Sequence, residues 1–468
     1  MNGGKKNPRA SEPRKILETS LQGTPLCPSP LNHSQTTTQS ISMKLPLFLM
    51  PLAFIVSAQA DWPQFQGPQR TGVSQETGLA RSFPKDGPPI LWETKLQQGF
   101  GGCAVAEGEV FIVDRIMQEK DMLLCLDAQS GKEKWRYESP SKGEPSFPGS
   151  RSVPTVDGDS VYFIGSFGRV HCVDRDSRKA RWTVKMSDRY ADAKTPKWGY
   201  AQCALVVGDI IFVTPFGSET GVAGWDRKTG EEVWKSGPIG DSHASPTVLE
   251  IGGDPHVVLV SKEGSTGYTT SYNPKDGSIL WQTSDYYNRI PIPIVTKISE
   301  DLIFVTGGYD CGSKMLSLRK TSDGYKASEK WTIKKGTQIH PPFVIDKHLY
   351  FLANENSNHR VSDKRKTGGL SCWNLDGQEV WRTGDDPFMG RGGCLYADGM
   401  LIIQDGEKGT LRLVEPSPEG FKLLAEANVF DSDLTSKKDL KFWSPMALSD
   451  GRLYMRGQNR LLCISLKK

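Results

Sequence analysis

The sequence lacks the residue spacings that metal sites use. It has nine cysteines and seven histidines, but no CxxC, no HExxH and no close Cys/His cluster. Structural and catalytic zinc sites need such ligands at short, regular spacings. We therefore expect no metal site.

An excess of charge of either sign is also missing from most of the chain. The whole chain has 58 Lys/Arg and 54 Asp/Glu, and residues 1–60 hold six of the former and two of the latter. The remainder therefore carries 52 positive and 52 negative side chains. A protein organised around nucleic acid would show a basic excess. We expect no nucleic-acid partner.

The apolar run near the N-terminus is too short to cross a membrane. Leu45–Val56 has twelve residues, whereas a spanning helix needs about 20. Met43-Lys44 precedes this run and Ala58-Gln59-Ala60 follows it, which completes the three parts of a secretory signal peptide. We predict a signal peptide at residues 43–60 and an exported, periplasmic or extracellular chain with no transmembrane helix.

Residues 1–42, ahead of that signal, are polar and show no periodicity. The simplest interpretation is an extension from a start codon assigned too early, with Met43 as the true initiator. A transit peptide is the alternative, but Glu12 and Glu18 argue against it because such peptides are poor in acids.

One phrase recurs along the rest of the chain. Its first copy, Leu123–Glu138, has an apolar run, Asp127, a turn with Gly131 and a short strand centred on Trp135. Gly131 can adopt the positive φ that a tight hairpin turn requires. Seven tryptophans fall in register, at intervals of 43, 47, 52, 47, 50 and 50 residues: Trp92, Trp135, Trp182, Trp234, Trp281, Trp331 and Trp381. Such a period, with four short strands in each repeat, predicts propeller blades.

A second phrase, a small or Pro/Cys residue followed by an apolar strand, occurs eight times. The last copy, Pro445–Arg456, is followed by no tryptophan strand, whereas Ile90–Leu96 is a tryptophan strand with no preceding hairpin. We predict an all-β, eight-bladed β-propeller over residues 90–468, after an N-terminal segment at 61–89. Its N-terminal strand closes the C-terminal blade, and its seventh blade, Cys394–Phe430, has lost the tryptophan.

Seven cysteines recur at two equivalent strand positions. Cys103, Cys203 and Cys394 share the start of the innermost strand; Cys125, Cys172, Cys372 and Cys463 precede a hairpin turn. Small buried packing residues show this pattern. Export would permit disulfides, and Cys103 with Cys125 is the pair to test first, but we favour packing.

The phrase D-x-x-[ST]-G-[KE]-x-x-W, present as Asp127–Trp135 and Asp226–Trp234, resembles the repeat of pyrroloquinoline-quinone (PQQ)-like propellers. That family contains quinoprotein alcohol dehydrogenases and the non-enzymatic, BamB-like outer-membrane assembly factors. Asp61–Leu79 also resembles the N-terminus of secreted PQQ-like repeat proteins of planctomycete-type bacteria. The resemblance implies that the seven tryptophans dock each blade on the next.

The resemblance gives weaker support to an enzyme. Quinoprotein dehydrogenases usually carry an adjacent Cys-Cys disulfide, Glu and Asn ligands to calcium and a catalytic Asp. This chain has no adjacent cysteine pair and lacks the long insertions that build their pocket. We therefore expect no cofactor and assign no catalytic residue, with PQQ and calcium as the alternative.

The loops that lead into the innermost strands are the places where propellers usually bind ligands. Seven side chains in these loops are candidates for a channel mouth: Arg151, Tyr200, His243, Arg289, His340, Arg391 and Trp443. Arg151 and Arg391 suit a carboxylate or phosphate, Tyr200 and Trp443 offer stacking faces, and the histidines could titrate near neutral pH. Taken singly, each is more simply a loop residue that caps a turn.

Three functional hypotheses follow. The first is an exported, non-enzymatic binding or assembly scaffold of the cell envelope, a monomer that binds an envelope protein or a small anionic or carbohydrate ligand. The second is a quinoprotein-like oxidoreductase with a degenerate site, and the third is a carbohydrate-binding propeller. A polar insertion, Asn354–Gly369, is predicted to be a solvated loop, with docking of an acidic partner as the alternative.

The first testable prediction concerns processing. We expect cleavage after Ala60, which leaves Asp61 at the N-terminus, because the small residues there form a signal-peptidase site. N-terminal sequencing of the exported protein decides this. A mature chain that retained residues 1–42 would contradict both the signal peptide and the proposed start at Met43.

Overall fold

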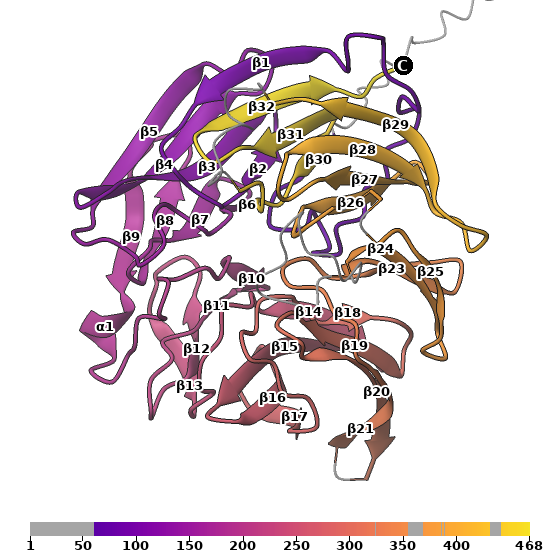
Figure 1. Ribbon diagram of the computed structural model, residues 1–468. Coiled ribbons are helices and arrows are strands. Elements are labelled where there is room, and N and C mark those ends of the chain that lie inside the picture. Colours follow the sequence, from indigo (N-terminus) through magenta and orange to yellow (C-terminus); the bar gives the residue numbers. More distant parts are fainter. Residues whose placement is uncertain (1–59, 323, 354–367, 385, 388, 431–440) are drawn as a thin grey trace, which may run out of the picture. The chain divides into compact units, whose positions relative to one another are not determined.

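Eight four-stranded antiparallel sheets make up nearly all of the regular structure (Figure 1). The computed structural model describes residues 60–322, 324–353, 368–384, 386–387, 389–430 and 441–468. The predicted N-terminal extension, the signal peptide before residue 60 and most of the polar insertion lie outside these residues. In the described part, no helix has the length and apolar character needed to span a membrane.

The blades follow one another along the chain, each built from the innermost strand outward. Blade 1 is β2 (Cys103–Ala106), β3 (Glu109–Ile116), β4 (Lys120–Asp127) and β5 (Glu133–Pro140); blade 2 is β6 (Thr155–Asp157), β7 (Ser160–Ile164), β8 (Arg169–Asp174) and β9 (Ala180–Lys185). Blade 3 is β10 (Leu205–Val207), β11 (Ile210–Val213), β12 (Val222–Asp226) and β13 (Glu232–Ser236); blade 4 is β14 (Thr247–Ile251), β15 (Asp254–Glu263), β16 (Thr266–Tyr272) and β17 (Ile279–Thr283).

The second half of the chain repeats this arrangement. Blade 5 is β18 (Thr296–Lys297), β19 (Leu302–Gly307), β20 (Gly312–Thr321) and β21 (Gly324–Ile333); blade 6 is β22 (Phe343–Ile345), β23 (His348–Ala353), β24 (Gly369–Asn374) and β25 (Glu379–Arg382). Blade 7 is β26 (Cys394–Ala397), β27 (Met400–Gln404), β28 (Thr410–Glu415) and β29 (Lys422–Asn428); blade 8 is β30 (Ala447–Ser449), β31 (Arg452–Arg456), β32 (Arg460–Ser465) and β1 (Ile90–Lys95). The helix α1 (Met186–Arg189) follows β9.

The predicted eight-bladed ring and its closure are confirmed. β1 pairs antiparallel with β32, with Trp92 opposite Cys463, and Figure 1 shows the first strand lying beside the last one. The N-terminal strand thus supplies the outer strand of blade 8. This pairing removes the open blade that a linear array of sheets would leave.

Most in-register tryptophans bond to the following blade. Five indole N–H groups donate to a carbonyl oxygen in the hairpin turn of that blade: Trp92 to Ala128, Trp182 to Arg227, Trp234 to Pro274, Trp331 to Leu375 and Trp381 to Ser417, at 2.8–3.1 Å. In four of these turns a glycine lies directly against the ring: Gly131, Gly230, Gly277 and Gly377. A Cβ at Gly277, whose φ is +71°, would come within 2.2 Å of Trp234. Trp281 instead donates within its own blade, to His256 Nδ1 at 3.1 Å.

Small residues lie opposite the tryptophans in most blades, whereas Met315 faces Trp331 in blade 5. Cys125, Cys172, Cys372 and Cys463 face Trp135, Trp182, Trp381 and Trp92 across the strand pair. In blade 7, Ala425 stands where the other blades carry tryptophan, and it pairs with the larger Leu413. All eight cysteines of the described residues are free and seven are buried. The recurrence of a cysteine opposite four of the tryptophans is explained by the space that each indole occupies.

The segment before β1 crosses the end of the propeller axis. We call residues 61–80 the N-terminal strap. Its backbone and side chains make hydrogen bonds to residues of seven blades: Val105, Val156, Ala204, Pro246, His340, Tyr396 and Leu466. The strap is therefore an integral part of the ring.

The second prediction concerns docking. Trp234→Ala should lower the free energy of unfolding by about 3–5 kcal/mol, because the indole is 7% exposed and bonds to Pro274. Val233→Ala is the matched control, since Val233 is the preceding residue of the same strand and 52% exposed. Chemical denaturation measures both. Equal losses for the two variants would contradict a docking role.

Candidate functional site

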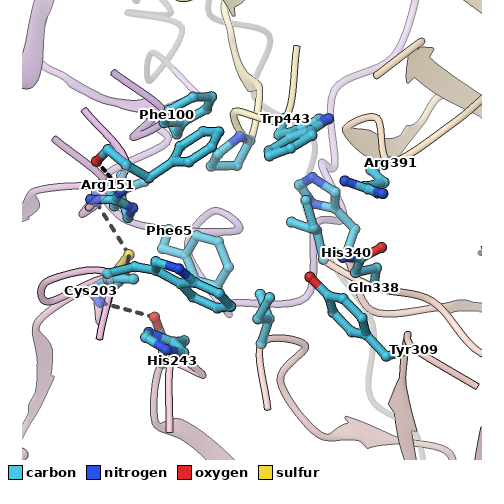
Figure 2. Close-up of a pocket in the computed structure, with 18 residues that line it drawn as sticks. Phe65, Phe100, Arg151, Cys203, His243, Tyr309, Gln338, His340, Arg391 and Trp443 are labelled. Carbon is cyan, nitrogen blue, oxygen red and sulfur yellow. Dashed lines mark hydrogen bonds between the residues drawn. The ribbon is translucent and has the colours of Figure 1, made fainter. Parts of the chain in front are cut away.

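The loops that lead into the innermost strands surround one cavity of about 370 Å³. Figure 2 shows its walls. The lining is mostly aromatic and aliphatic and includes two arginines and two histidines: Phe65, Phe100, Phe147, Arg151, Val153, Trp198, Ala201, Cys203, His243, Ser245, Ile292, Tyr309, Gln338, Ile339, His340, Arg391, Trp443 and Pro445. An apolar cavity with a few convergent polar groups is the usual form of a small-molecule site.

The structure brings five of the seven candidate residues to this cavity: Arg151, His243, His340, Arg391 and Trp443. Tyr200 and Arg289 are not part of the lining. Tyr200 is 3% exposed and packs against Phe216 at 5.9 Å, and its hydroxyl donates to the Lys194 carbonyl. Arg289 is exposed at the surface. Side chains from corresponding loops of different blades therefore do not all point toward the propeller axis.

Thirteen of the 18 lining residues are not among the seven candidates that the sequence offered, and Phe65, Phe147 and Gln338 are three of these. Phe147 and Gln338 come from loops of variable length, so the blade repeat does not align them. Phe65 comes from the N-terminal strap, outside the repeat altogether. The phrase Asp61–Leu79 was a visible signal, but its resemblance to other N-termini carries no information about where Phe65 points.

Arg151 is a partly desolvated cation in the cavity wall. Its guanidinium donates to two neutral acceptors, the carbonyl oxygens of Phe147 and Gly149. Burial lowers the pKa of Arg151 to about 10, and the nearby positive charge of Arg115 acts in the same direction. No Asp or Glu lines the cavity. The wall is therefore positively charged, without a carboxylate in the lining to balance it.

The second arginine belongs to an aromatic cluster. The guanidinium carbon of Arg391 lies 5.0 Å from the ring centroid of Trp443, a favourable cation–π arrangement. Phe147 stacks on Trp443 at 6.1 Å and 14°, and Phe100 contacts both rings. These rings form a flat apolar wall beside a cation.

Both cavity histidines are neutral at physiological pH. We expected them to titrate near neutral pH, but burial lowers the pKa of His243 to about 4 and that of His340 to about 4. Trp198 lies 4.8 Å from the His243 ring. His340 Nδ1 lies 3.3 Å from the side-chain amide nitrogen of Gln66. Because an amide nitrogen can only donate, Nδ1 is the acceptor, and the proton of the neutral ring lies on Nε2.

The lining does not suit a calcium-held quinone. Calcium takes six to eight oxygen ligands, mainly carboxylates and carbonyls, and the lining contains no Asp or Glu. Within the described ranges, no group of three or more His, Cys, Asp or Glu side chains is arranged to hold a metal ion. We therefore assign no step to such a cofactor.

The sequence of the chain decides its family. A family model described as outer membrane protein assembly factor BamB matches residues 79–196 and 166–324, which together span more than half of the chain. The chain belongs to this PQQ-like propeller family. No curated protein matches the chain significantly.

Several solved structures share the fold. BamB from Moraxella catarrhalis is 14% identical with a TM-score of 0.55, over 81% of this chain and 98% of that one. The quinohemoprotein alcohol dehydrogenase from Comamonas testosteroni is 12% identical with a TM-score of 0.58, over 87% and 81%. The dehydrogenase ADHIIG from Pseudomonas putida HK5 is 12% identical with a TM-score of 0.54, over 87% and 80%. At these identities the likeness establishes the propeller architecture alone.

The third prediction concerns pH. His340 is neutral in the folded protein down to about pH 4, whereas in the unfolded chain it binds a proton below about pH 6.5. Because the unfolded state binds more protons between these values, stability is complete above pH 6.5 and falls as the pH drops toward 4. Lowering the pH from 7.5 to 5 should cost about 2 kcal/mol through this histidine.

Denaturation of the wild type and of His340→Gln at the two pH values measures this effect. The relevant quantity is the difference between pH values within each protein, since the substitution itself changes stability. The variant should lose less stability on acidification than the wild type. Equal losses would mean that His340 is not held neutral by burial.

Proposed function

We propose that this protein is an exported, non-enzymatic binding propeller of the cell envelope, whose central cavity takes a small anionic ligand with an apolar body. The observation that carries this proposal is Arg151, a partly desolvated cation in a lining that contains no carboxylate. An anion supplies the charge that the lining lacks. The aromatic walls suit the apolar remainder of the ligand.

The physical basis is the cost of keeping a cation away from water. Within the described part of the chain, Arg151 donates hydrogen bonds only to two backbone carbonyls, those of Phe147 and Gly149, and it forms no ion pair there. A charge-assisted hydrogen bond to a ligand contributes about 1.5–3 kcal/mol. An arginine already fixed by two carbonyls loses little side-chain entropy when the ligand binds.

The lining also favours binding over catalysis. A general acid–base pair needs a group that titrates near the working pH, and both histidines are neutral with their pKa values near 4. Burial raises the pKa of the Cys203 thiol, which disfavours the thiolate needed for nucleophilic attack. A quinoprotein-like oxidoreductase with a degenerate site is therefore the weaker proposal.

A role as an envelope scaffold rests on the family and on the predicted signal peptide. The family model is named for an outer-membrane assembly factor, and an exported monomer would meet envelope proteins. The carbohydrate-binding alternative draws on Trp198 and Trp443 at the cavity, because sugars stack on such rings. We favour the anionic ligand over a sugar, because a neutral sugar would leave the positive charge of Arg151 unbalanced.

The fourth prediction tests the anion. Benzoate should bind more tightly than benzamide, its neutral counterpart of similar shape, and Arg151→Ala should weaken benzoate about 10- to 150-fold. Arg289→Ala is the matched control, because Arg289 is an exposed arginine from an equivalent loop outside the lining. Isothermal titration measures the affinities, and thermal melting checks that each variant is folded. Equal affinity of wild type and Arg151→Ala for benzoate would refute the proposed site.

A further inference from the structure

The cavity is closed at one end by the N-terminal strap. In blades 2, 3, 4 and 7, the strap bonds to a residue that lies further along the chain than a residue that lines the cavity. Val153 lines the cavity and Val156 donates to the strap carbonyl of Pro63; Cys203 lines it and Ala204 accepts from Arg70. Because all innermost strands start at the cavity and run away from it, the strap lies at the deep end.

A second pair of contacts repeats this order in other blades. Ser245 lines the cavity and the next carbonyl, that of Pro246, accepts from Arg70 Nη1 at 2.8 Å. Arg391 lines it, and Tyr396 exchanges backbone hydrogen bonds with Gly72 and Ser74 of the strap. The strap therefore spans the axis below the cavity.

The strap is held firmly in this place. Arg70 is 3% exposed and bonds to Gln64 within the strap as well as to two blades. Gln66 and Arg70 both have a positive φ, of 61° and 57°, a conformation that non-glycine residues keep only where surrounding contacts impose it. Gln66 also reaches the wall residue His340. A segment fixed in this way can act as a rigid floor.

One strap side chain reaches into the cavity. Phe65 lines it, and Figure 2 places its ring inside the circle of wall residues, toward the side of Arg151 and Cys203. Its neighbours Trp62 and Gln66 are buried, whereas Phe65 is only half-buried, as expected for a ring with one face toward an open space. Phe65 therefore forms the bottom of the space that the loops surround.

We propose that Phe65 is the specificity-determining residue of the cavity, setting the length of the apolar body that an anionic ligand can bury. This inference rests on the proposed function, because it assumes that an anion held at Arg151 directs its apolar end toward the strap. Each methylene buried before the floor should raise the affinity about fourfold. Methylenes beyond the floor should add nothing.

The fifth prediction uses straight-chain carboxylates as probes. Butanoate, hexanoate, octanoate, decanoate and dodecanoate are titrated into the full protein below their micelle concentrations. The wild-type affinity should rise with chain length and then level off. Phe65→Ala should move this plateau to longer chains, and Phe65→Trp should move it to shorter ones. A general loss of affinity in a variant would not move the plateau in opposite directions for the two substitutions.

Phe147→Ala serves as the comparison, because Phe147 is a phenylalanine of the same lining that is 39% exposed and belongs to the loop wall. It should weaken every chain length by a similar factor and leave the plateau in place. Phe65→Leu replaces Phe65→Ala if thermal melting shows that the latter is unfolded. The affinity of Phe65→Leu should then level off at a chain length longer than that of the wild type.

The outcomes separate the two proposals. If carboxylates bind with Arg151-dependent affinity but no Phe65 variant moves the plateau, the floor is overturned and the proposed function stands. If the wild type binds none of the carboxylates, or Arg151→Ala leaves their binding unchanged, the proposed function is overturned and this inference falls with it. Opposite shifts of the plateau for Ala and Trp support both.

Discussion

The contact on which this ring depends is the indole of one blade resting on the hairpin turn of the next. In five blades the N–H reaches a turn carbonyl in the following blade, and a glycine in several of these turns leaves room for the ring. The contact satisfies a buried donor and buries a large apolar surface at once. It also fixes the angle between successive sheets, so eight blades close on themselves.

Closure of the ring also requires contacts between the first and the last blade. β1 supplies the missing strand to β32. Arg456 of blade 8 is fully buried and bonds to the carbonyls of Gly101 and Val113 and to Asp114, all in blade 1 or the loop before it. A buried charge is costly unless it is paired and hydrogen-bonded, as this guanidinium is through its two terminal nitrogens. The seam is thus sealed by a strand and by an ion pair.

The closed ring gives the cavity its chemistry. All innermost strands start at the same end of the axis, so the loops before them converge, and the strap closes the other end. His243, His340 and Arg151, which line the cavity, are all partly removed from water. The histidines respond by becoming neutral, and Arg151 keeps its charge with only carbonyl partners. The cavity therefore combines an apolar lining and neutral histidines with the positive charge of Arg151.

The sequence by itself determined the blades, their number, the closure by Ile90–Lys95 and the absence of a tryptophan from blade 7. These features depend on local patterns that recur with the blade, because each sheet forms from consecutive residues and each indole meets the next turn. Only the tertiary structure decided the site. Arg151 and Tyr200 hold equivalent positions in the repeat, yet one lines the cavity and the other packs behind it. Phe65 lies outside the repeat and becomes the floor, because burial and direction depend on contacts from segments far away in the chain.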